Sequence, residues 1–301
     1  MIEAQCGAAA FEFHLPVMAR EVVSRLGLKA GMRVVDSTLG GGGHAAAIIE
    51  AISPGGEFIG IDRDPDAISA SMARLEAPGS RIRLIRGRMG EMGTILNDSG
   101  FESVDAILAD LGVSSFQLDT ASRGFSFGKD APLDMRMDPT CGGNALDLIA
   151  SMDEGELAAI IREYGEERYA RRIARALSKK SIRTTGELAA AVAAAVPPQA
   201  RHGRIHPATR TFQALRIAVN DEMGELSRFL ETAPGKLSAG GRLAVISYHS
   251  LEDRKVKHSF RGAVAHGGFS LPFRRPVIPN DEEIAVNPRA RSAKLRVMER
   301  I

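Results

Sequence analysis

Residues 31–62 constrain the fold of this chain most, because they alternate between strand, glycine turn, helix and strand. The apolar run 32–36 predicts a strand, and four consecutive glycines follow at 40–43. Residues 57–62 predict a second strand that ends in an acidic side chain. Consecutive glycines weaken a chain unless the backbone must approach another group closely. This order is typical of the first βαβ unit of a sheet that binds a ligand at its glycine turn.

The alternation of strands and helices continues along most of the chain. A helix is predicted over 66–75, and apolar residues from Phe212 to Leu230 recur every three or four positions, which predicts one long amphipathic helix. The pattern indicates an α/β fold built from βαβ units in a parallel sheet. Further strands are predicted at 81–85, 104–110, 241–247 and 294–298.

Residues 151–196 interrupt the alternation with a wholly helical pattern of roughly 50 residues, which indicates a domain inserted between the fourth and fifth strands. Helix starts are predicted by three capping boxes, namely Ser151 with Glu154, Thr184 with Glu187 and Ser250 with Asp253. The predicted domains are a sheet domain, 1–125 with 205–301, and an all-helical insert, 126–204.

Composition excludes several classes of protein. No run of 18 apolar residues exists, which excludes a membrane-spanning helix, and residues 1–5 lack the basic start of a secretory signal. Cys6 and Cys141 are the only cysteines and form no C-x-x-C pair, which argues against a disulfide framework and a cysteine-zinc site. We expect a cytoplasmic protein without a metal ion. The net charge of +2 does not by itself indicate nucleic-acid binding.

The glycine turn matches the dinucleotide fingerprint Gly40-x-Gly42-x-x-Ala45, with Asp62 at the end of the next strand. Nicotinamide cofactors place a pyrophosphate at such a turn, whereas S-adenosylmethionine carries a sulfonium and an ammonium group. Asp36, just before the turn, would repel a pyrophosphate and attract the cationic methionine end. This charge favours S-adenosylmethionine, with Asp62 accepting hydrogen bonds from its ribose.

Asp110 ends the predicted fourth strand, at the sheet edge that faces the ligand crevice in folds of this type. A carboxylate there can accept a hydrogen bond from an aromatic amine and aim the lone pair of the nitrogen at a methyl donor. Ser114 is a second catalytic candidate, and the alternative is that Ser114 and Ser115 cap a helix. His44 either packs at the start of its helix or folds over the cofactor.

With these residues in view, the chain resembles a bacterial family, small-subunit ribosomal RNA methyltransferase H, formerly called MraW. The similarity runs from about Phe13 to the C-terminus, and its ordered motifs are far more specific than the glycine turn alone. The motifs are 110–115 (DLGVSS), 123–127 (RGFSF), 132–139 (PLDMRMDP), 164–167 (YGEE), 171–175 (RRIAR), 206–216 (HPATRTFQALR), 247–254 (SYHSLEDR) and 287–291 (NPRAR).

The resemblance implies a class I methyltransferase fold, in which a doubly wound, Rossmann-like sheet carries the helical insert between strands 4 and 5. It implies N4-methylation of one cytidine in the decoding region of 16S ribosomal RNA, in the small ribosomal subunit, with S-adenosylmethionine as the methyl donor. The insert would help to recognise the RNA. Met89 stands where an aromatic residue is common in the family. The implied cofactor contacts are Gly42, Gly43, His44, Asp62, Met89, Asp110 and Gln117.

Three residues are candidates for contacts with the substrate. Arg210 and Gln213 fall on the polar side of the long predicted helix, where a plain solvated face is the alternative. His249 follows the fifth strand, where it either packs or contacts the target base, so it is also a catalytic candidate. Because a cytosine amine is buried in a paired helix, the target must be single-stranded or extruded.

Two other functions stay open on the sequence alone. One is a nicotinamide-dependent oxidoreductase, although the chain has no Tyr-x-x-x-Lys motif and Asp36 opposes a pyrophosphate. The other is a non-catalytic ribosome-assembly factor that binds RNA. The intact glycine turn, Asp62 and Asp110 favour an enzyme over such a factor. The sequence does not specify the oligomeric state.

Overall fold

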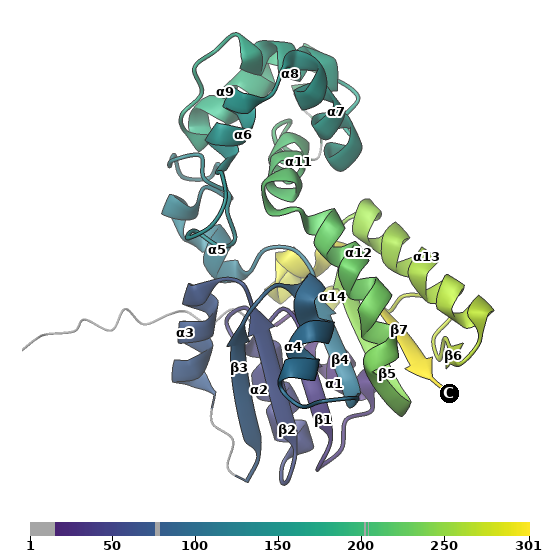
Figure 1. The fold of residues 1–301 in the computed structure, drawn as a ribbon. Helices are drawn as coiled ribbons and strands as arrows, with labels where there is room; N and C mark the ends of the chain where they lie inside the picture. The colour runs from purple at the N-terminus through teal and green to yellow at the C-terminus, as the bar shows by residue number, and fades with distance from the viewer. Residues whose placement is uncertain (1–15, 76–78, 202, 204) are drawn as a thin grey trace, which may run out of the picture.

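The computed structural model describes residues 16–75, 79–201, 203 and 205–301 (Figure 1). Cys6, the first 15 residues of the predicted sheet domain and the start of the family similarity near Phe13 lie outside these ranges. Cys141 is exposed and is a free cysteine. Among the helices of the described residues, none combines the length and the apolar character that crossing a membrane requires.

Seven strands form one sheet in the order β3-β2-β1-β4-β5-β7-β6. Strands β1 to β5 run parallel, and β7 pairs antiparallel with β5 and β6. The predicted α/β class I methyltransferase fold is confirmed. Sequence does not predict the antiparallel direction of β7, because an alternating pattern is the same in both directions. The strands are β1 Arg33–Asp36, β2 Glu57–Asp62, β3 Arg81–Arg86, β4 Val104–Asp110, β5 Leu237–Ser247, β6 Phe269–Ser270 and β7 Lys294–Arg300.

Helices cover both faces of the sheet. Successive side chains of a strand point to opposite sides, so apolar residues on both faces need to be covered. Val34 packs with Ile48 of α2, whereas its neighbour Val35 belongs to the opposite core with Phe229 of α12. The elements around the sheet are α1 Ala19–Leu26, α2 Gly43–Ile52, α3 Pro65–Arg74, η1 Met89–Glu91, α4 Met92–Asp98, α12 Glu222–Thr232, η3 Ala233–Lys236, α13 Ser250–His266, α14 Asp281–Val286 and η4 Pro288–Ser292.

The remaining helices lie beyond one end of the sheet (Figure 1) and have a hydrophobic core of their own. Leu157, Ile173 and Leu188 are fully buried in it, and Phe212 of α11 packs into the same core. The predicted domain boundary at 204 stays a prediction, and the packing associates α11 with the insert. The helices are α5 Ser115–Asp119, η2 Ala121–Arg123, α6 Ala145–Ser151, α7 Glu154–Gly165, α8 Ala170–Ser178, α9 Thr185–Ala195, α10 Pro198–Arg201 and α11 Thr209–Asn220.

The prediction of one long helix from Phe212 to Leu230 is wrong. The chain forms α11 and α12, and Asp221 between them adopts a left-handed backbone with φ of 49°. Asn220 holds the break in place, because its side chain accepts the Met137 N–H at 2.8 Å and donates to the Met135 carbonyl at 2.7 Å. Apolar spacing continues across the break, so periodicity does not reveal it.

Of the three predicted capping boxes, the one at Thr184 is confirmed as the start of α9. The boxes at Ser151 and Ser250 are wrong. Near each of them, a different residue can act as the N-cap and is followed three positions later by a glutamate. In both places that second pair closes the box and fixes the helix start. The observed boxes are Asp153 with Glu156 for α7 and His249 with Glu252 for α13.

Candidate active site

A cavity of about 1240 Å³ opens at the carboxyl ends of β1, β2, β4 and β5 and extends toward the start of α12. Such an edge is where doubly wound sheets bind ligands, since loops there lead away from a reversal in strand order. The reversal lies between β1 and β4, which are neighbours in the sheet. Sequence-predicted site residues in the cavity lining are Gly43, His44, Asp62, Met89, Asp110, Ser114 and Gln117.

The glycine turn between β1 and α2 forms one wall of the cavity. Gly40 and Gly42 have φ angles of 51° and 74°, in the left-handed region that glycine adopts without steric cost. Gly42 is absent from the lining and instead lets α3 approach, because a Cβ there would lie 3.0 Å from the Ser71 Oγ. The Ser71 hydroxyl in turn donates to the Gly40 carbonyl at 3.0 Å.

Asp62, at the end of β2, holds the turn from the opposite side. Its Oδ2 accepts the Gly40 N–H at 2.8 Å and its Oδ1 accepts the Asp64 N–H at 2.9 Å. Burial raises the pKa of Asp62, whereas these two hydrogen bonds lower it. Each carboxylate oxygen has a second lone pair, so the side chain can still accept hydrogen bonds from a ligand in the cavity.

Asp36 lies beneath the turn, outside the cavity lining, and is almost fully buried. Its Oδ1 accepts the Thr38 N–H at 3.0 Å, whereas Oδ2 is a buried oxygen without a hydrogen-bond partner in the described residues. Burial raises the pKa of Asp36 to about 6, although the nearby His44 opposes this rise. A carboxylate in this position makes its surroundings favourable for a cation.

His44 is buried at the start of α2, where its ring lies between Val17 and Asp110. Its Nε2 lies 2.8 Å from the Val17 carbonyl, which can only accept, so Nε2 carries a proton. Its Nδ1 lies 3.6 Å from the Asp110 Oδ2. Burial lowers the pKa of His44, and this favours the neutral ring at physiological pH. The imidazole therefore packs in the wall of the cavity next to Asp110.

Asp110 projects from the end of β4 into the cavity. Its Oδ1 accepts a hydrogen bond from the Tyr248 hydroxyl at 2.8 Å, and its N–H donates to Thr38 at 2.6 Å. Burial raises the pKa of Asp110 to about 7, although the Tyr248 hydrogen bond opposes this rise. Sequence reasoning missed Tyr248, whose only signal is its place beside His249 at the end of the fifth strand.

Ser114 and Gln117 form the capping box of α5. Ser114 accepts the Gln117 N–H at 3.2 Å, and the Gln117 side chain accepts the Ser114 N–H at 3.0 Å. The Gln117 amide also donates to Asp64 at 2.8 Å. Ser114 is thus the N-cap that the sequence offered as its alternative role, although it lines the cavity as well. A catalytic role for Ser114 stays a prediction.

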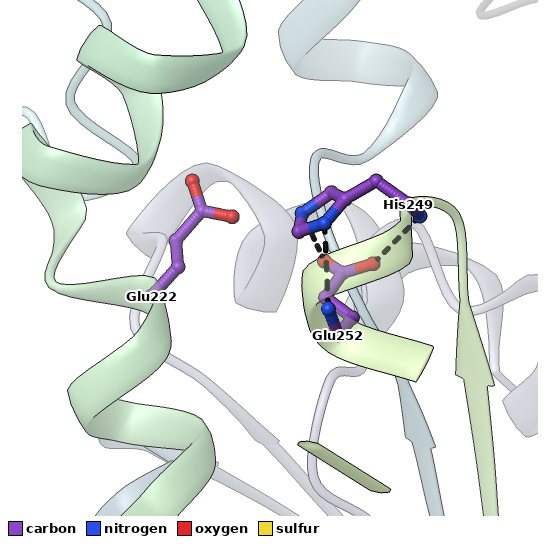
Figure 2. Close-up of side chains that lie close together, drawn as sticks. All are labelled: Glu222, His249 and Glu252. Atoms are coloured by element: carbon purple, nitrogen blue, oxygen red, sulfur yellow. Dashed lines mark hydrogen bonds and ion pairs between the residues drawn. The ribbon is translucent and has the colours of Figure 1, made fainter. Parts of the chain in front are cut away.

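Glu222, His249 and Glu252 lie together at the far side of the cavity (Figure 2). Their ligand atoms lie within 4.8 Å of one another, a spacing that could hold a metal ion. Arg216 already neutralises Glu222, because its Nε and Nη2 contact the two carboxylate oxygens at 2.8 Å each. Glu252 is paired with His249, whose Nε2 lies 3.1 Å from the Glu252 Oε1. Arg216 thus compensates the charge of Glu222, whereas the His249 ring lies against Glu252.

His249, Arg210 and Gln213 are not part of the cavity lining. His249 caps α13, Gln213 donates to the Tyr164 carbonyl at 2.8 Å, and Arg210 donates to the Glu166 carbonyl at 3.2 Å. The last two contacts fasten α11 to the end of α7. A contact of these three side chains with RNA stays a prediction.

Comparison with known proteins matches almost the whole chain. Ribosomal RNA small subunit methyltransferase H of Geobacter sulfurreducens is 51% identical, over 96% of this chain and 99% of that protein. The protein of the same name from Trichlorobacter lovleyi is 48% identical, over 96% and 98%. A solved rRNA methylase from Streptococcus thermophilus aligns with a TM-score of 0.40 at 12% identity, over 94% of this chain and 95% of that one. The model of the MraW methylase family matches residues 11–301. By this match and by the identity to its curated relatives, the chain belongs to the MraW methylase family.

Proposed function

We propose that this protein transfers a methyl group from S-adenosylmethionine to the N4 amine of one cytidine in the decoding region of 16S ribosomal RNA. The single observation that carries the proposal is the placement of Asp110. This half-buried acceptor lines the same large cavity as the glycine turn. Family membership supports the substrate class, since the similar curated proteins are named for the small-subunit ribosomal RNA.

The residues around the turn fit S-adenosylmethionine by charge and shape. Asp36 has a buried carboxylate oxygen without a partner in the described residues, which favours a cationic ligand nearby and disfavours a pyrophosphate. Gly43, His44 and Met89 line the cavity as well, and Asp62 offers acceptors to a ribose. When bound, S-adenosylmethionine supplies a methyl group on a positively charged sulfur.

The chain's own contribution to the reaction is orientation. Asp110 accepts an N–H of the cytosine amine and aims the nitrogen lone pair toward the donor, and a fixed orientation can contribute up to about 7–11 kcal/mol. Tyr248 holds one oxygen of Asp110, which leaves Oδ2 as the acceptor for the base. Burial and the charge of Asp110 raise the pKa of Tyr248 well above its usual value, so its hydroxyl stays a donor.

A methylation assay tests the proposed function against its alternatives. We expect the protein to incorporate labelled methyl from S-adenosylmethionine into small subunits from cells that lack it, and digestion of the RNA to yield one N4-methylcytidine. An oxidoreductase would instead be stabilised against heat by a nicotinamide nucleotide. A non-catalytic assembly factor would bind the subunits and incorporate no label.

Asp62→Ala is expected to weaken S-adenosylmethionine binding about 10- to 100-fold, because charge-assisted hydrogen bonds contribute about 1.5–3 kcal/mol each. Isothermal titration calorimetry measures the change. Glu57→Ala is the matched control, since Glu57 begins the same strand and lies outside the cavity lining. Equal cofactor affinity of the wild type and Asp62→Ala would remove Asp62 from the binding site.

A further inference from the structure

The cavity lining includes a basic side chain that the methyl donor does not explain. Arg216, near the end of α11, lines the cavity together with Tyr248 and Gly112. A Cβ on Gly112 would lie 4.0 Å from the Arg216 Nη1 and 3.9 Å from the Tyr248 ring. The Tyr248 hydroxyl donates a hydrogen bond to Asp110, and the guanidinium and the carboxylate belong to the lining of the same cavity.

Arg216 is rigidly held with one end available to a ligand. Its Nε and Nη2 form a two-pronged contact with Glu222, each at 2.8 Å, and Glu222 begins the helix after the break at Asp221. In the part of the chain that the structure describes, Nη1 takes part in no hydrogen bond or ion pair. Figure 2 shows Glu222 reaching toward His249 and Glu252 from its own helix. A donor fixed in this manner loses little conformational freedom when it binds.

Asp110 and Arg216 match the pairing edge of cytosine. That edge presents an N–H of the amine as a donor, followed by the acceptors N3 and O2. Asp110 offers an acceptor for the first, and the two N–H groups on the Nη1 atom of Arg216 offer donors for the other two. Uracil would place a carbonyl against Asp110 and an N–H against Arg216. A polar site of this kind rejects mismatched analogues strongly, because its buried groups would be left unpaired.

Building on the proposed function, we propose that Arg216, held by Glu222, is the residue that recognises the N3 and O2 edge of the target cytosine. Asp110 selects the amine and Arg216 selects the neighbouring acceptors. The break between α11 and α12 is what turns the Glu222 carboxylate back onto Arg216 on the preceding helix.

Replacing both Arg216 and Glu222 distinguishes a role in recognising the base from a purely structural role of their ion pair. Arg216→Met alone leaves Glu222 buried without its partner, so it can also destabilise the fold. The double variant Arg216→Met with Glu222→Leu removes both charges and is expected to keep the wild-type melting temperature within a few degrees. We expect this variant to lose about 100-fold in kcat/KM for small subunits, while its affinity for S-adenosylmethionine by calorimetry is unchanged.

Two further variants complete the experiment. Arg216→Lys keeps the charge but cannot reproduce the two-pronged contact with Glu222 while a separate nitrogen faces the base, so it is expected to lose about 10-fold or more in kcat/KM. Arg242→Met with Glu299→Leu removes another arginine–glutamate pair, with a single contact at 2.8 Å, outside the cavity lining and should leave kcat/KM unchanged. A stable Arg216/Glu222 double variant with wild-type kcat/KM would overturn the inference while leaving the proposed function intact. If the wild type itself methylates no cytidine, the proposed function fails first.

Discussion

Asp110→Ala is expected to lower kcat for methyl transfer by at least about 10³-fold, with little change in melting temperature. The substitution removes the acceptor that orients the amine, and single preorganised hydrogen-bonding groups contribute about 10²–10³-fold to kcat in other enzymes. Because the amine is then no longer held in a fixed orientation toward the methyl donor, kcat is expected to fall further. Single-turnover incorporation of labelled methyl into small subunits measures the rate.

Asp110→Asn is the matched variant for this position, since it keeps the shape and one acceptor oxygen but removes the charge. It is expected to retain more activity than Asp110→Ala. A turnover of Asp110→Ala close to that of the wild type would show that the amine is oriented by another group.

The same carboxyl predicts the pH dependence of the reaction. Burial raises the pKa of Asp110 to about 7, so the protonated form dominates below that pH and the accepting, ionised form above it. We expect kcat/KM to rise as pH increases through about 7 and then to level off. Tyr248→Phe removes a hydrogen bond that lowers this pKa, so its profile should shift to higher pH. Identical profiles for the two proteins would contradict the assignment.

Arg123→Met is expected to destabilise the protein by about 3–5 kcal/mol, because it leaves a buried carboxylate without its cation. Arg123 lies between the sheet and the insert and is 9% exposed. Its Nη2 donates to Asp64 at 2.9 Å and to the Met137 carbonyl at 2.7 Å, which links the loop after β2 to residues leading into the insert. Urea unfolding monitored by circular dichroism measures the free energy of unfolding.

An exposed ion pair of the insert provides the control for Arg123. Arg175→Met removes a contact to Glu154 in which both side chains are largely exposed, and such pairs contribute only about 0–1 kcal/mol. Equal, small effects of the two substitutions would show that the contact between Arg123 and Asp64 does not hold the insert to the sheet.

Local sequence patterns were sufficient to predict the strands, the glycine turn and the acidic residues at the strand ends. Asp62 and Asp110 are predictable as residues of one cavity, because the carboxyl ends of parallel strands share one edge of the sheet. Helix starts are less reliable. At Ser250 a neighbouring residue, His249, became the cap because Glu252 could close the box with it.

The contacts between site residues were not predictable, because they depend on how separate elements pack against one another. Tyr248 meets Asp110 across 138 positions, and no spacing rule connects them. Arg216 and Glu222 are only six positions apart, yet their contact depends on the left-handed residue between the two helices. Apolar periodicity continues through that residue, so the pattern indicates a straight helix in which Arg216 and Glu222 would not be neighbours.

What the sequence by itself determined is the type of fold, the glycine turn and the carboxylate at the end of β4, since each depends on residues close together along the chain. Only the tertiary structure decided that Tyr248 holds one oxygen of Asp110, that Arg216 pairs with Glu222 and how the helical insert is attached. Those properties depend on hydrogen bonds and ion pairs between elements, and such contacts exist only once packing has brought the elements together.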